Sequence, residues 1–131
     1  AAFVNFVVNH PTVRATAPEG RYVVDTAPVV EDSANVVRAV DGGVCIFRRV
    51  TAQLYEGHIY CVAGYRGRRA LELVHGALNA VFERPAASIA VAFAPLHLPA
   101  VAVLCRRAGF VCKGRDLLDE RYELEVSKWN S

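Results

Sequence analysis

The clearest pattern of apolar and polar positions in the chain lies between residues 68 and 83. Apolar residues recur there at intervals of three and four, which places them along one side of an α-helix. The apolar positions are Ala70, Leu71, Val74, Ala77, Leu78, Val81 and Phe82, and the other face carries Glu72, His75, Asn79 and Glu83. Arg84 precedes Pro85 and so disfavours helical geometry. We therefore predict a helix over residues 68–83.

A second helix is predicted over residues 99–108. Pro99 suits the first position of a helix, and Gly109 suits the left-handed residue that closes one. Between the two helices, residues 88–93 form a short continuous apolar run, SIAVAF. Such a run is typical of a central strand that is buried on both faces.

A hairpin is predicted around Asp41-Gly42-Gly43. Two β-branched runs, residues 35–40 and 44–50, flank this sequence. Asp-Gly supplies the positive φ angles that a tight hairpin turn needs. A third strand is predicted over residues 56–63.

The two ends of the chain have weaker patterns. Residues 1–9 are apolar with two asparagines four apart, which predicts a short buried helix, and residues 10–33 predict a long loop with room for one helical turn. Near the other end, an outer strand is expected to begin in residues 110–114, and residues 116–120 predict a turn. Residues 121–129 alternate between apolar and polar positions, which predicts a half-exposed strand.

The order of these elements indicates the fold class. Strand-helix-strand units that follow an antiparallel hairpin imply an α/β fold of the mixed (α+β) kind, with helices on both faces of the sheet. The length of 131 residues and the absence of a linker or repeat predict one domain over residues 1–131.

Composition excludes several classes of protein. The net charge of +2 is too small for a nucleic-acid-binding domain. No apolar run approaches the ~20 residues that span a bilayer, and no signal peptide is recognisable. Four cysteines without a CxxC pair predict reduced thiols in a cytosolic compartment, with disulfides as the less favoured alternative. The histidines have no metal-ligand spacing, so we expect no metal.

One loop has an unusual sequence, GYRGRRALEL over residues 64–73. It places Arg66, Arg68 and Arg69 beside two glycines at the start of the predicted helix. Unpaired N–H groups and the helix dipole make such a start a ready anion site, and arginines add charge-assisted contacts to phosphates. The hypothesis is a phosphate or pyrophosphate site. The alternative is a solvated arginine cluster.

The sequence resembles the GNAT family of N-acetyltransferases. The resemblance is carried by YRGRRALELVHGALNAVFE, then SIAVAF, then LPAVAVLCRRAGF, and it extends over about residues 1–128. The opening NFVVNHPTVR, together with the loop YRGRRALE, is similar to a bacteriophage-encoded branch of acetyltransferase-like proteins. The resemblance implies a GNAT-like central mixed β-sheet flanked by helices on both faces. The family's first strand would precede Ala1 and is expected to be missing.

The resemblance also implies a cofactor, acetyl-CoA. Arg66 takes the first place of the family's loop motif, the backbone from Gly67 to Ala70 would receive the pyrophosphate, and the Val62 N–H would polarise the thioester carbonyl. The implied cofactor-binding residues are Val62, Arg66, Gly67, Arg68, Arg69 and Ala70.

Four positions depart from the family pattern. Arg69 stands where the motif has glycine, and Leu71 stands where it has glycine or alanine. Leu98 stands at a place that often holds asparagine. Cys105 takes the place that often holds a tyrosine general acid. A thiol of pKa ~8.5 could protonate a leaving thiolate, or it could be a small apolar filler.

Glu56 and His58 are the candidates for the base that takes a proton from the acceptor amine. They lie two residues apart, so they share one side of the predicted strand before the loop. A base or a water relay is the functional hypothesis, and an exposed strand pair is the alternative.

Two functions follow as hypotheses. The first is an acyl-CoA-dependent N-acyltransferase that acts in the cytoplasm on a small-molecule or protein amine. The second is a catalytically inactive GNAT-like fold that serves as a structural or binding module, for example as a bacteriophage virion protein in capsid decoration or assembly. A sheet without its first strand would leave an open edge, through which the chain could form a homo-oligomer or a larger assembly.

Overall fold

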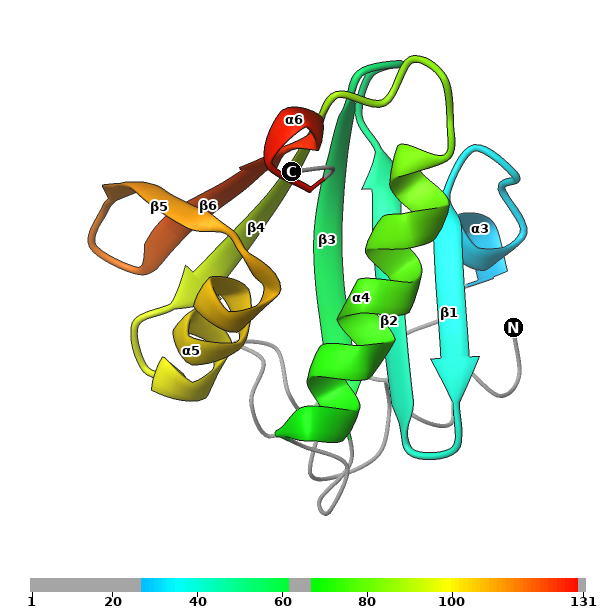
Figure 1. Ribbon diagram of the computed structural model, residues 1–131. Coiled ribbons are helices and arrows are strands. Elements are labelled where there is room, and N and C mark those ends of the chain that lie inside the picture. The colour runs from blue at the N-terminus through cyan, green and yellow to red at the C-terminus, as the bar shows by residue number, and fades with distance from the viewer. Residues whose placement is uncertain (1–26, 62–66, 130–131) are drawn as a thin grey trace.

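The computed structural model describes residues 27–61 and 67–129. Within these residues, six strands form one mixed sheet in the order β1-β2-β3-β4-β6-β5 (Figure 1). The elements are α3 Ala27–Val30, β1 Val36–Val40, β2 Gly43–Arg49, β3 Leu54–Cys61, α4 Arg68–Phe82, β4 Ile89–Pro95, α5 Pro99–Ala108, β5 Val111–Arg115, β6 Asp119–Glu125 and α6 Val126–Trp129.

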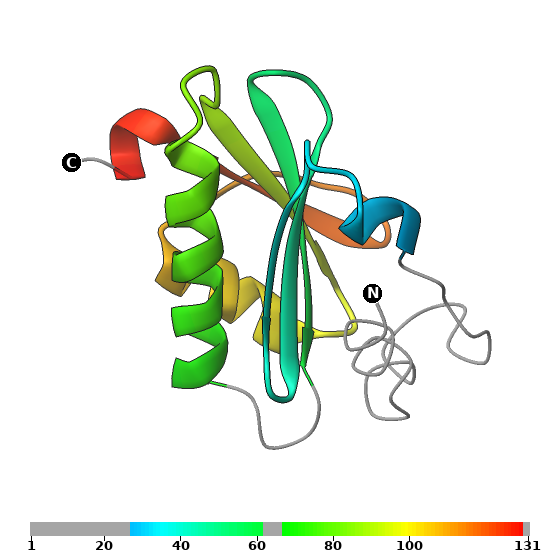
Figure 2. The same cartoon turned by 90° about the vertical axis from the view of Figure 1, so that its right-hand side faces the viewer.

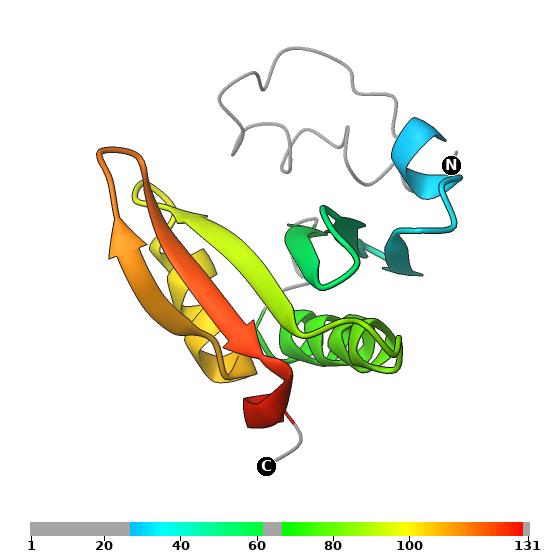
Figure 3. The same ribbon diagram turned by 90° about the horizontal axis from the view of Figure 1, so that it is seen from above.

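Helices lie on both faces of the sheet, as predicted. On one face α4 packs against β1 and β2, α5 packs against β4, and the two helices touch each other. The short helix α3 lies on the opposite face, where Val29 and Val30 pack against Val44 and Ile46 of β2 (Figures 2 and 3). We call the face under α4 and α5 the helical face, and the face that carries α3 the open face.

The main core lies between the helical face and the two helices α4 and α5. Ala77, Leu78 and Val81 of α4 are completely buried there, and Tyr122 of β6 is completely buried as well. Full burial of a side chain the size of valine or leucine stabilises the fold by about 1.5–3 kcal/mol. The apolar stripe read from the sequence is therefore the stripe that holds α4 on the sheet.

An arginine just beyond α4 joins that helix to the entry of β1. The guanidinium of Arg84 donates to the backbone oxygens of Ser33 (3.2 Å), Asn35 (3.3 Å) and Ala34, and to the hydroxyl of Tyr55 (3.1 Å). The same group lies 5.5 Å from the centre of the Tyr55 ring. One side chain thus ties the loop before β1 to strand β3.

Most predicted boundaries agree with the structure to within two residues. Gly42 has a φ of 86° in the hairpin turn, and Gly109 has a left-handed φ of 102° and closes α5. Helix α4 begins at Arg68, as predicted, and ends at Phe82. The one helical turn allowed in residues 10–33 is α3. The helix predicted over residues 1–9 lies outside the described residues.

The prediction of a strand through residue 129 was wrong. Strand β6 begins at Asp119, inside the predicted turn, and stops at Glu125, after which α6 turns away. The indole N–H of Trp129 donates to Asn79 Oδ1 of α4 (3.2 Å), and its ring meets His75 edge-on with centroids 5.4 Å apart. This contact with α4 overrides the local alternation of the sequence.

Candidate functional site

Strands β3 and β4 separate part-way along their length. These two parallel strands pair from Leu54 opposite Ile89 to Gly57 opposite Ala92, and their pairing ends there. Beyond that point β3 stays paired with β2, and β4 stays paired with β6 (Figure 1). The sheet therefore divides at the carboxyl ends of two parallel strands, the place where α/β sheets generally bind ligands.

Helix α4 begins beside this division. Only residues 62–66 separate the end of β3 at Cys61 from Gly67, the N-cap residue of α4. Gly67 has a φ of 65°, and nothing lies within 4 Å of where its Cβ would be. Glycine is thus favoured here by the backbone conformation, with open space around the α-carbon.

The first turn of α4 has the features of an anion site. Within the described residues no side chain caps it, and its first turn contains no acidic residue. Arg68 is 91% exposed and pairs with Glu72 one turn later at 3.4 Å. Arg69 is exposed and Ala70 is buried. Uncapped amide groups at a helix start, together with the helix dipole, favour an anion.

Two of the six predicted cofactor residues, Val62 and Arg66, lie outside the described residues. The departures at Arg69 and Leu71 fall inside α4. Among the described residues no non-glycine has a positive φ, so Arg69 has a backbone conformation that any residue adopts. The replacement of a motif glycine by arginine is therefore compatible with the helix.

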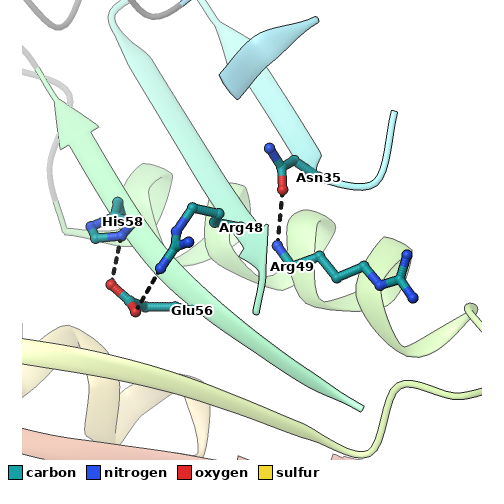
Figure 4. Close-up of polar contacts among 5 residues, drawn as sticks. All are labelled: Asn35, Arg48, Arg49, Glu56 and His58. Carbon is teal, nitrogen blue, oxygen red and sulfur yellow. Dashed lines mark hydrogen bonds and ion pairs between the residues drawn. The ribbon is translucent and has the colours of Figure 1, made fainter. Parts of the chain in front are cut away.

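The predicted pair Glu56 and His58 lies on the open face of β3, next to the division. The Nε2 atom of His58 is 3.0 Å from Glu56 Oε1, and Nη2 of Arg48 on β2 is 3.4 Å from Glu56 Oε2. Figure 4 shows the carboxylate between the histidine and the arginine. Side-chain exposure is 25% for Glu56, 43% for His58 and 48% for Arg48, so ligands from solvent can reach the group.

Sequence reasoning missed Arg48 and the residue that fixes its strand, Asn35. The Asn35 side chain donates to the Val29 carbonyl of α3 (2.9 Å). It also accepts from the Arg49 backbone N–H of β2 (2.9 Å), the contact drawn in Figure 4. It thereby ties α3 to the end of β2. The register of the β2–β3 pair, which places Arg48 opposite Glu56, is the signal that would have found Arg48.

Cys105, the candidate acid, lies in the main core. It is 7% exposed, and burial raises its pKa to about 11, against a smaller opposite effect of Arg106. Burial also raises the pKa of Cys45. None of the four cysteines, all of which lie in the described residues, forms a disulfide. Cys105 thus stays protonated at neutral pH, but its thiol is largely enclosed by protein.

In residues 27–61 and 67–129, no three His, Cys, Asp or Glu side chains are grouped so that they could hold a metal ion. No helix in the same ranges is long and apolar enough to cross a membrane.

The chain is similar to solved structures, although no family model and no curated protein match its sequence. Among solved structures, the spermidine N-acetyltransferase of Vibrio cholerae in complex with CoA and spermine is similar, with a TM-score of 0.76, 16% identity, and 99% of this chain and 92% of that chain covered. The chain has the GNAT fold. This likeness shows the fold alone.

A second GNAT-fold structure supports the same conclusion. The Campylobacter jejuni N-acetyltransferase PseH in complex with acetyl coenzyme A matches with a TM-score of 0.62 and 17% identity. The match covers 75% of this chain and 72% of that chain.

Proposed function

We propose that this GNAT-fold chain is an acyl-CoA-dependent N-acyltransferase, which moves an acetyl group from acetyl-CoA to an amine. The observation that carries the proposal is the separation of β3 and β4 beside the uncapped start of α4. An anionic ligand at Gly67 could extend from there between the two strands. The similar solved structures support the proposal, because they are N-acetyltransferases that hold acetyl coenzyme A or CoA.

The residues at the start of α4 fit the phosphate part of acetyl-CoA. In the proposal, the backbone from Gly67 to Ala70 binds the pyrophosphate, and Arg68 and Arg69 supply positive charge. Arg66 and Val62 keep the roles that the family resemblance implies. When bound, acetyl-CoA supplies an activated acetyl thioester.

The open face supplies the base in this proposal. Glu56 and His58 lie where β3 leaves β4, so a proton acceptor stands next to the division of the sheet. Cys105 is the candidate acid through the resemblance alone, because its thiol is enclosed in the core.

The acceptor class is an amine, of a small molecule or of a protein. The Vibrio cholerae relative is named for spermidine and holds spermine, and small polyamines are therefore the first acceptors to test. A homo-oligomer or an assembly through a sheet edge stays a prediction, and the edges of the described sheet are β1 and β5. Neither the described residues nor the comparisons add support for a bacteriophage virion module.

The test is the melting temperature of the purified chain with and without millimolar acetyl-CoA. A ligand that binds only the folded state stabilises it by about 2.7 kcal/mol at a hundred times its Kd. We expect a rise of several degrees for the wild-type chain and none for Gly67→Asp, because the aspartate repels phosphate. Gly67→Ala is the matched control, since its Cβ meets the same open space and the same backbone strain at a φ of 65° but adds no charge.

Two outcomes would contradict the proposal. If acetyl-CoA does not raise the wild-type melting temperature, the division of the sheet does not bind it. If Gly67→Asp binds acetyl-CoA as tightly as Gly67→Ala does, the start of α4 is not the phosphate site.

A further inference from the structure

Two adjacent leucines are the most exposed large apolar side chains in the part of the chain that the structure describes. Leu117 is 94% exposed and Leu118 is 74% exposed, and they lie in the turn between β5 and β6. We infer that this turn, residues 116–119, docks the acceptor, and that the acceptor amine belongs to a protein segment with apolar and basic residues. The inference rests on the proposed transferase function. It goes further because it selects a protein amine over a small-molecule amine and names the residues that recognise it.

The backbone of the turn does not require leucine. Turn positions usually hold glycine, proline, asparagine, aspartate or serine, which suit the tight geometry or bond to the backbone. Across the described residues no non-glycine has a positive φ, so positions 117 and 118 could hold many polar residues without strain. Leucines left in water also forfeit the stabilisation that burial gives an apolar side chain. Two adjacent exposed leucines therefore suit a contact with a partner molecule.

Hydrogen bonds fix the backbone that carries the leucine pair. Asp116 Oδ1 accepts from the backbone N–H groups of Leu118 and Asp119, each at 2.8 Å. The Asp116 N–H donates to the Asp119 carbonyl (3.0 Å), and the N–H of Leu96 donates to the Leu118 carbonyl (2.8 Å). The turn is thus ordered before a partner arrives, which lowers the entropy cost of binding.

The bond to Leu96 also places the turn beside the candidate site. Strands β3 and β4 are parallel, so their carboxyl ends lie at the same edge of the sheet, where the two strands have separated and α4 begins. Leu96 directly follows the last residue of β4, and Figure 3 shows the β5–β6 turn next to that end. A protein segment that brings an amine between β3 and β4 can therefore contact the turn as well.

The charges around the leucine pair fit a basic partner. Asp116 and Asp119 flank the pair, and the backbone N–H groups of Asp119 and Leu118 hold the pKa of Asp116 below its usual range. On β5, Arg115 lies opposite Glu120 of β6, so these two charges offset each other, and Lys113 lies farther from the turn at an irregularity of the β5–β6 pairing. Lysine side chains and amino termini are cationic before transfer, and an acidic rim attracts them.

The first test measures docking without catalysis. The probe is a fluorescein-labelled amphipathic peptide of lysine and leucine, followed by fluorescence anisotropy. We expect it to bind the wild-type chain and to bind the double variant Leu117→Ser/Leu118→Ser about tenfold more weakly. The same peptide with glutamate in place of lysine should not bind.

Val103→Ser is the matched control for the double variant. It removes another exposed apolar side chain, 43% exposed on α5, and should bind the lysine peptide as the wild-type chain does. Unchanged melting temperatures establish that the variants are folded, which the high exposure of all three positions leads us to expect. Equal affinity of the double variant and the wild-type chain would overturn the inference.

The second test compares acceptors in the presence of acetyl-CoA. The ratio of kcat/KM for the lysine peptide to kcat/KM for spermidine should fall by about tenfold in the double variant, through a higher KM for the peptide. Asp119→Asn should raise the KM for the peptide by about two- to fivefold, and this effect should shrink at high salt. A wild-type chain that acetylates spermidine but not the peptide would make the acceptor a small molecule, against the inference.

Two further outcomes separate the inference from its alternatives. If sedimentation equilibrium shows a wild-type dimer that the double variant does not form, the turn docks a second copy of the chain and the inference is wrong. A chain that transfers acetyl to no amine refutes the proposed function. The anisotropy measurements then still decide whether the turn binds a basic apolar segment.

Discussion

Gly57→Ala tests how closely Phe47 packs beneath strand β3 at the residue between the two candidate bases. Gly57 lies between Glu56 and His58, and it is the last residue of β3 that pairs with β4. A Cβ added there would lie 2.5 Å from Cε1 and 2.9 Å from Cζ of Phe47, on the neighbouring strand. Real side chains do not approach so closely, so the ring or the strand has to move.

Two opposing effects decide the magnitude. Replacing glycine by alanine reduces the entropy of the unfolded chain, which stabilises a protein by about 0.4–1 kcal/mol where the backbone allows it. Overpacking a close-packed core costs about 1–3 kcal/mol. Phe47 is 2% exposed and belongs to the main core, so it has little room to move. We expect a net loss of about 1–2 kcal/mol in the free energy of unfolding.

The assay is urea denaturation of Gly57→Ala beside a matched control and a rescue variant. Gly76→Ala, on helix α4, adds a Cβ with nothing within 4 Å, and should stabilise the chain by about 0.5–1 kcal/mol. Phe47→Leu removes the ring edge, so in its background Gly57→Ala should cost much less. If Gly57→Ala is as stable as Gly76→Ala, or if Phe47→Leu gives no relief, the packing argument is wrong.

Three further predictions concern the fold. Arg84→Met should lower the free energy of unfolding by about 2 kcal/mol, because it removes charge-assisted bonds to backbone oxygens. Arg107→Met, at an exposed position, serves as the control. Equal losses in the two variants would contradict the role of Arg84. The Cys105 pKa rises from 9.0 to about 11 on folding. The buried thiol therefore makes its full contribution to the free energy of unfolding below pH 9, and roughly 2 kcal/mol of that contribution is lost as pH rises toward 11. Denaturation at pH 7 and pH 10 checks this, and Cys105→Ala should reduce the fall. Trp129→Ala should cost about 1–2 kcal/mol by removing the contact with Asn79, and an unchanged melting temperature would show that α6 is not held by α4.

Local patterns predicted the elements whose signals lie within a short stretch of sequence. The apolar stripe of α4 and the glycine after α5 can each be recognised from residues within a few turns, and both boundaries follow from the sequence. The alternation that predicted a strand through residue 129 failed because Trp129 reaches Asn79, fifty residues earlier in the chain. Nothing in the sequence of residues 121–129 indicates that contact.

In the candidate site, too, the sequence determined the local features and the tertiary structure determined the long-range contacts. The sequence alone determined the anion-favouring start of α4 at Gly67 and the shared side of Glu56 and His58, since a turn glycine and a two-residue spacing are local properties. Only the tertiary structure decided that Arg48 faces Glu56 and that β3 leaves β4 after Gly57. Those facts depend on strand register and on where pairing stops, which are set by packing between segments far apart in the chain.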